Sequence, residues 1–145
     1  MGDRWKKKRG KYCAVLSELM RPTPSAKVVG WIEARPRSRL GITAITQAEI
    51  LYGIELLPKG RRKSGLLAAA QTMFSEDFRG TVFPFNSDAA HAFAKISAAR
   101  HTQGKPISQL DAQIAAIVQT LGAELATRNV TDFEGCGIKL LNPWG

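Results

Sequence analysis

The stretch RLGITAITQAEILYGIELL, residues 39–57, indicates the fold class of this chain. Its first part, residues 39–45, is rich in apolar and β-branched side chains and predicts a short buried strand. Its second part, residues 46–57, repeats apolar residues at the spacing of one helix face. The residues on that face are Ile50, Leu51, Ile54 and Leu57. A strand that leads directly into an amphipathic helix is one unit of an α/β fold.

The same alternation continues along the chain. Further strands are predicted at residues 12–16, 80–85, 123–128 and 137–144. Further helices are predicted at residues 25–34, with Ser25 as N-cap, and at 61–78, 87–104 and from 107 onward. Strands that alternate with helices predict an α/β/α sandwich whose central sheet is mainly parallel and covered on both faces.

Length and composition bound the possibilities. The chain has 145 residues, 44% of them hydrophobic and 23% charged, which is typical of a single globular domain. No apolar run is long enough to span a bilayer, and no signal-peptide core follows the N-terminus, so we expect a cytoplasmic protein. The widely separated Cys13 and Cys136 fit no metal spacing and are expected to be free thiols.

The net charge of +9 is unevenly distributed. Residues 1–11 carry six basic side chains and one acid, and we expect them to form a disordered basic segment ahead of a domain at residues 12–145. The domain itself is also basic. A chain with a pI near 10 favours a polyanionic partner, most simply nucleic acid.

Four polar residues follow predicted strands or begin helices: Glu49, Asp111, Asn129 and Asp132. In open α/β sheets, binding sites lie beyond the carboxyl ends of the strands, so these side chains are expected at one edge. Clustered carboxylate and amide oxygens suit Mg²⁺ or Mn²⁺. A bound ion of this kind can activate water and stabilise charge on a phosphate.

Each of these residues also has a purely structural interpretation. Thr46 and Glu49 have the spacing of a capping box in the first turn of a helix, and Ser108 and Asp111 nearly so. Asn129 and Asp132 can form Asx turns after a strand. The pattern alone therefore leaves both a metal site and helix capping open.

Five segments resemble the PIN-domain ribonucleases, and specifically the VapC- and FitB-like toxins of bacterial toxin–antitoxin pairs. They are VLSELMRPTPSAKVVGWI, ITAITQAEILYGIELLPKGRRK, MFSEDFRGTVFPF, KPISQLDAQIAAI and LATRNVTDFEGCGIKLLNPW. Their order and spacing follow that family from Val15 to Trp144.

The resemblance implies a flavodoxin-like α/β/α sandwich with an acidic pocket that holds Mg²⁺, or Mn²⁺, and cleaves RNA. It implies a homodimer and a cognate antitoxin that blocks the pocket. Glu49 matches the family's acid in the AE motif, Asp111 the acid that opens the later helix, and Asn129 the fourth acidic position. Asp132 matches the DF ending and is expected to support the site from the side.

One departure affects the expected activity. The family's first strand ends in Asp-Thr-Asn, whereas this chain has Tyr12, Cys13 and Ala14 at the corresponding positions. The first acidic metal ligand is therefore absent. Two functions remain open: a Mg²⁺-dependent endoribonuclease toxin with an impaired site, or a non-cleaving PIN-domain remnant that still binds antitoxin or RNA.

Overall fold

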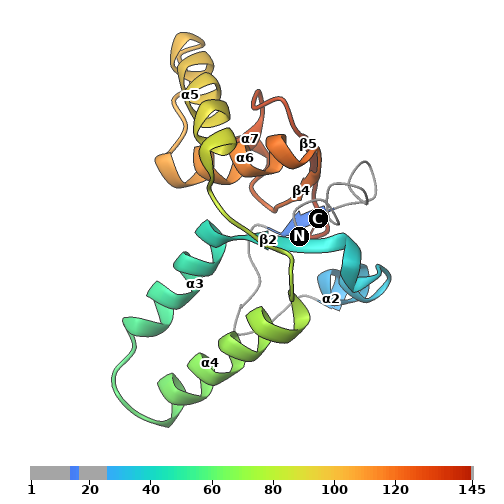
Figure 1. Ribbon diagram of the computed structural model, residues 1–145, viewed down its shortest axis with the longest axis vertical. Helices are drawn as coiled ribbons and strands as arrows, with labels where there is room; N and C mark the ends of the chain where they lie inside the picture. The colour runs from blue at the N-terminus through green and yellow to red at the C-terminus, as the bar shows by residue number, and fades with distance from the viewer. Residues whose placement is uncertain (1–13, 17–25, 145) are drawn as a thin grey trace.

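The structure, a computed structural model, describes residues 14–16 and 26–144. Several predictions concern residues outside this part: the disordered segment 1–11, the substituted Tyr12 and Cys13, and the N-cap Ser25. Ala14 is the first described residue. Helices and strands alternate along the described chain, as expected (Figure 1).

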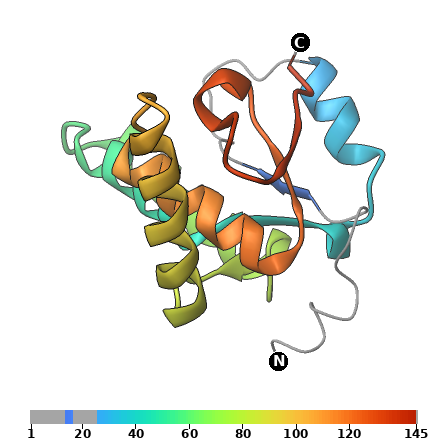
Figure 2. The same ribbon diagram turned by 90° about the horizontal axis from the view of Figure 1, so that it is seen from above.

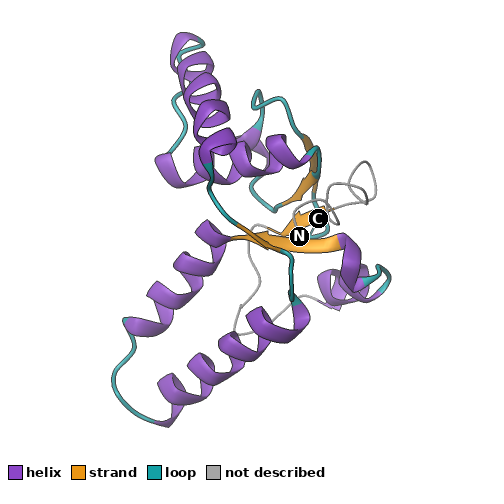
Figure 3. Ribbon diagram, viewed as in Figure 1, coloured by secondary structure: helices purple, strands orange, loops and turns teal. Residues whose placement is uncertain are grey.

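Five short strands form one sheet in the order β3-β2-β1-β4-β5. They are β1 (Ala14–Leu16), β2 (Leu40–Thr43), β3 (Val82–Phe83), β4 (Glu124–Ala126) and β5 (Lys139–Leu141). Every neighbouring pair is parallel, which confirms the predicted sheet. Figure 3 shows the strands in orange between groups of helices.

The helices are α2 (Ala26–Glu33), α3 (Ala44–Glu55), α4 (Arg61–Thr72), α5 (Ser87–Thr102), α6 (Gln109–Leu121) and α7 (Val130–Phe133). A 3₁₀ turn, η1 (Arg37–Arg39), precedes β2, and a π-helical turn, η2 (Met73–Asp77), continues α4. The short α7 was not predicted, because its four residues are too few to show a helical period. No helix in the described ranges is long and apolar enough to cross a membrane.

The strands are shorter than the apolar runs that predicted them. The run at residues 39–45 is a strand only as far as Thr43, because the Thr43 side chain accepts the Thr46 N–H at 3.0 Å and begins α3. The run at residues 80–85 pairs only at Val82 and Phe83, and the next residue, Pro84, has no N–H to donate to a ladder.

Alternate residues of the strands bury opposite faces of the sheet, which is why the fold has three layers. Val15 and Leu125 belong to a core cluster with α5, α6 and α7. Leu16, Leu40 and Ile42 belong to a second cluster with side chains of α2 and η2. Figure 2 shows α2 and the pair of α5 and α6 on opposite sides of the strands.

Gly41 in β2 provides a test of the packing between β2 and β3. A Cβ atom at Gly41 would lie 2.5 Å from the Phe83 ring and 2.9 Å from the Thr81 carbonyl oxygen. Gly41→Ala should therefore lower the free energy of unfolding by about 1–3 kcal/mol, as overpacking typically does. Urea denaturation measures this change.

Gly65 of α4 is the matched control, because nothing lies within 4 Å of its added Cβ. Gly65→Ala should raise the free energy of unfolding by about 0.5–1 kcal/mol, since alanine favours the helix. Equal stabilities for the two variants would contradict the close approach at Gly41.

Candidate functional site

Two carboxylates meet at the carboxyl edge of the sheet. Glu49 lies in the second turn of α3, and the half-buried Asp111 lies in the first turn of α6. Partial burial raises the pKa of Glu49 above its ordinary value of 4.5, and the negative charge of Asp111 raises it further. The charged form of Glu49 is therefore destabilised in the free protein, and a bound cation would stabilise it.

The start of α6 holds Asp111 in place. Ser108 is the N-cap residue, and its side-chain oxygen accepts the Asp111 N–H at 3.2 Å. This confirms the predicted cap. The backbone of Asp111 makes the capping contact, so its carboxylate stays available for another partner.

The start of α3 differs from the predicted capping box. The N-cap is Thr43, not Thr46, and the Thr43 hydroxyl also donates to the Thr46 side-chain oxygen at 3.2 Å. Because the helix begins three residues earlier than expected, Glu49 falls outside its first turn. The prediction that Glu49 lies in the first turn was therefore wrong, and capping does not account for this carboxyl group.

Asn129 and Asp132 follow β4, as predicted. The Asn129 N–H donates to the buried Thr127 hydroxyl at 3.0 Å, and the Asn129 side chain makes no capping bond to α7. Both side chains are exposed. Among the described residues, no hydrogen bond or ion pair joins either of them to Glu49 or Asp111.

The donor set is smaller than a closed metal site requires. Within the described ranges, no group of three or more His, Cys, Asp or Glu side chains is placed to hold a metal ion. The pair of carboxylates fits Mg²⁺ chemically, because Mg²⁺ keeps several waters and often takes only one or two carboxylates. The fit is thus to a weak, open site.

The direction of β1 bears on the missing first acid. Ala14 pairs with Leu40 and Glu124, the first residues of β2 and β4, so it lies at the amino edge of the sheet. The carboxyl end of the strand is Leu16. Ala14, which the resemblance aligns with the last residue of the family's Asp-Thr-Asn, therefore lies at the opposite edge from the one that follows the strands.

A cavity of about 350 Å³ lies at the amino edge instead, and its lining includes Ala14, Arg35, Arg39 and Glu124. The Glu124 carboxylate is buried there, and its ion pair is with Lys139 at 3.6 Å. The cavity is on the opposite edge from Glu49 and Asp111, so it does not belong to the acidic site.

Arg100 is a structural element of the site that the sequence analysis missed. It is 6% exposed and lies in the last turn of α5. Its guanidinium donates to the carbonyl oxygens of Lys105 at 2.7 Å, Asp132 at 3.0 Å and Glu134 at 2.8 Å. One side chain thereby ties α7, which carries Asp132, to the loop that leads into α6, the helix that carries Asp111.

A signal for Arg100 was present in the sequence. Ala92, Ile96 and Arg100 recur every four residues along α5, and all three are buried. An arginine that continues an apolar row of a helix indicates a buried cation that must find acceptors. Here the acceptors are neutral carbonyls, which compensate the guanidinium without a carboxylate.

The comparisons with known proteins identify the class. The PIN domain family model matches residues 14–134, and the chain belongs to the PIN-domain family. It is 35% identical to VapC ribonuclease Y4jK of Sinorhizobium fredii over 130 residues, which is 90% of this chain and 93% of that protein.

Two further comparisons involve FitB. Toxin FitB of Neisseria gonorrhoeae is 32% identical over 130 residues, which is 90% of this chain and 94% of that protein. A solved structure of FitAB bound to a DNA fragment superposes with a TM-score of 0.84 at 31% identity, covering 91% of this chain and 96% of that one. The fold predicted from the sequence is therefore confirmed.

The raised pKa of Glu49 predicts a pH-dependent stability. The folded state holds the Glu49 proton more tightly than the unfolded chain does, so the free energy of unfolding should fall as pH rises from 4.5 through the raised pKa. In Glu49→Gln this part of the fall should be absent. Urea denaturation at several pH values between 4.5 and 7, in chelator, measures the difference.

The exposed Glu76 of η2 offers a matched control, because Glu76→Gln removes a carboxylate away from Asp111. Glu76→Gln should keep the pH dependence of the unmodified protein. A Glu49→Gln curve that falls as steeply as the unmodified protein's would contradict the pairing of Glu49 with Asp111.

Proposed function

We propose that this protein is a Mg²⁺-dependent endoribonuclease toxin of a bacterial toxin–antitoxin pair, with Mn²⁺ as an alternative ion. The observation that carries the proposal is the pair of Glu49 and Asp111 at the carboxyl edge of a PIN-domain sheet. The names of the relatives, a VapC ribonuclease and the toxin FitB, support the reaction and the biological role.

The roles of the residues follow from their chemistry. Asp111 and Glu49 would bind the ion through carboxylate oxygens, and the exposed amide of Asn129 would add a neutral oxygen from the end of β4. Asp132 would support the site from α7. A bound divalent ion supplies polarisation of the scissile phosphate and acidifies an attacking water.

The side chains of the site would orient the attacking water and accept a hydrogen bond from it. When the site is filled, Glu49 is held as a carboxylate, and an oxygen of Glu49 or Asp111 can accept a hydrogen bond from the attacking water and align it. The Thr43 and Thr46 hydroxyls bond to each other and fix the first turn of the helix that carries Glu49. Cleavage should be slower than in a site with a third carboxylate, because no third carboxylate joins Glu49 and Asp111 among the described residues.

The second candidate is a non-cleaving binding protein. It is favoured by the absence, among the described residues, of any group of three or more metal-ligating side chains. On this reading, the acidic pair serves only to bind a basic side chain of an antitoxin, or the domain binds RNA without cutting it. A metal-dependent cleavage assay separates the two candidates.

Asp111→Asn tests the enzymatic proposal. The substitution removes one charged ligand and keeps the shape, and the helix start stays capped by Ser108. RNA cleavage in Mg²⁺ should fall by about a hundredfold or more, since a poorly placed or underpolarised water costs that much. Product formation on a labelled structured RNA measures the rate, in Mg²⁺, in Mn²⁺ and in chelator.

The exposed Asp88 of α5 serves as the control, and Asp88→Asn should cleave like the unmodified protein. Activity that persists in chelator or in Asp111→Asn would contradict a metal site at this pair. No cleavage by any of the proteins, with stable binding of an antitoxin, would favour the non-cleaving alternative.

The proposed protein partner is a cognate antitoxin whose basic side chain enters the acidic pocket. A guanidinium or ammonium group beside two carboxylates forms strong charge-assisted hydrogen bonds. The resemblance also leads us to expect Glu18 at this interface, and Glu18 lies outside the described residues. We further propose that this protein acts on RNA in the cytoplasm.

Charge reversal tests this interface. Glu49→Lys with Asp111→Lys should weaken the complex with the antitoxin at least tenfold, because two attractive contacts become repulsive. Co-purification, followed by titration of the purified proteins, measures the affinity. Glu33→Lys with Glu76→Lys makes the same change in net charge at exposed positions and should bind normally. Equal loss in both pairs would argue against this placement.

A homodimer is the remaining proposal from the resemblance. Two large apolar side chains on α3, Tyr52 and Leu56, are each 66% exposed, and Leu110 at the start of α6 is 48% exposed. A second copy of the chain would cover this surface and remove apolar area from water. The molar mass from light scattering distinguishes a dimer from a monomer.

A further inference from the structure

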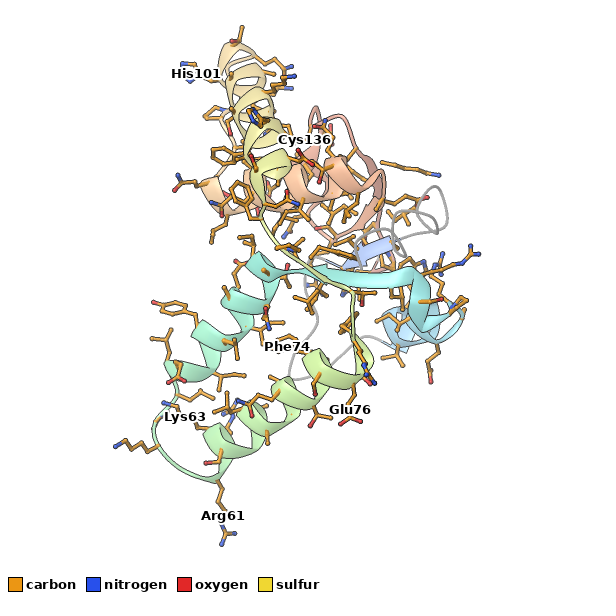
Figure 4. All side chains as sticks on the ribbon, viewed as in Figure 1. Arg61, Lys63, Phe74, Glu76, His101 and Cys136 are labelled. Atoms are coloured by element: carbon orange, nitrogen blue, oxygen red, sulfur yellow. The ribbon has the colours of Figure 1, made fainter. Side chains whose placement is uncertain are left out.

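The helices α3 and α4 form a hairpin that projects from the body of the molecule (Figure 1). Residues 56–60 connect them at its tip. Lys59, Arg61 and Arg62 lie at or beside this turn, and all three are exposed. Figure 4 shows Arg61 directed away from the rest of the protein. We refer to these three residues as the tip cations.

Lys63, the next cation along the chain, has a different role. Its ammonium group lies 3.3 Å from the Glu55 carboxylate and donates to the Glu55 carbonyl oxygen at 3.1 Å. It therefore ties the end of α3 to the first turn of α4. The tip cations form no ion pair with any described residue, and the sequence of α4 contains no acid.

The position of Arg61 and Arg62 is electrostatically unfavourable in the isolated protein. They occupy the first turn of α4, where the helix dipole places about half a positive charge. Cations there raise the local potential, whereas an acid would lower it. A ligand that relieves this excess must be anionic, and one that bridges several adjacent cations is most simply a polyanion with regularly spaced phosphates.

Glu49 lies in the second turn of α3, the other helix of the hairpin. Six residues separate it from Glu55, which corresponds to about 9 Å along α3. The carboxylates of Glu49 and Asp111 repel a phosphate backbone until a cation neutralises them. Attraction that brings RNA to this edge must therefore come from elsewhere, and the tip cations lie just beyond the C-terminal end of the helix that carries Glu49.

We propose that Lys59, Arg61 and Arg62 at the hairpin tip bind backbone phosphates of the RNA strand that enters the acidic site. This inference rests on the proposed function, because it names a binding contact for the same substrate. The contact is independent of base sequence, since ammonium and guanidinium groups read phosphate and not base edges. The contact supplies affinity for RNA near a site whose own carboxylates repel RNA.

Salt-dependent binding tests the proposal without requiring cleavage. The full chain is titrated into a fluorescein-labelled single-stranded RNA in chelator, and anisotropy is followed at several NaCl concentrations. For single strands the slope of log K against log salt is about −0.7 per phosphate contact. Arg61→Ala with Arg62→Ala should make the slope less negative by about 1.4, and affinity at 0.1 M salt should fall roughly 10- to 30-fold.

Lys27→Ala with Lys95→Ala is the matched control. It removes two exposed cations from α2 and α5 and changes the net charge equally. The control should retain the slope of the unmodified protein. Thermal unfolding midpoints should be unchanged or higher in the tip variant, because it removes cations from a helix N-terminus. If the tip variant is folded but binds RNA less tightly, the loss of affinity is due to the lost phosphate contacts.

The outcomes separate this inference from the proposed function. An equal slope in the tip variant and the unmodified protein, or an equal change in the control pair, would overturn the tip contact even if Mg²⁺-dependent cleavage is observed. A reduced slope in the tip variant with no cleavage by the unmodified protein would support the contact and contradict the enzymatic proposal. Tip-dependent binding to duplex DNA but not to RNA would overturn the assignment to RNA.

Discussion

The arrangement of the candidate site depends on one constraint. Strand β1 pairs with β2 on one side and with β4 on the other. The strand has only three residues, all buried, yet both of its edges are paired in parallel. Parallel pairing forces the following segments of β2 and β4 to emerge at the same edge. The helix that carries Glu49, and the segment that carries Asn129, therefore share that edge with the start of α6.

This protein has a positive net charge, but two carboxylates lie at that edge of its sheet. Glu49 and Asp111 place two carboxylates where no described cation pairs with them, and the cost appears as a raised pKa of Glu49. Three kinds of partner relieve such a pair: a proton, a metal ion or a basic side chain. A proton is available to the free protein at low pH, whereas a metal ion or a basic side chain requires a bound ligand or partner. The same chemistry thus fits both a metal-dependent nuclease and a surface that an antitoxin blocks.

The buried positive charge of Arg100 is compensated by backbone carbonyl groups and not by a carboxylate. Three backbone carbonyls surround its guanidinium, and the Cys136 sulfur lies 3.5 Å away. Burial of the thiol raises the pKa of Cys136, and the contact with Arg100 opposes that effect. Several hydrogen bonds from this one group converge on α7 and on the loop before α6, and they hold both segments to the end of α5. The hydrogen bonds thus link segments that lie far apart along the chain.

The amino-acid sequence by itself determined the alternation of strands and helices, the parallel sheet, the cap at Ser108 and the choice of Glu49 and Asp111. These follow from local spacing and from the rule that parallel strands share a carboxyl edge. Tertiary structure decided that Thr43 begins α3 and that Ala14 lies at the amino edge of the sheet. It also decided the partners of Arg100. Pairing register and the partner of a buried group depend on residues distant in the chain, which local patterns cannot specify.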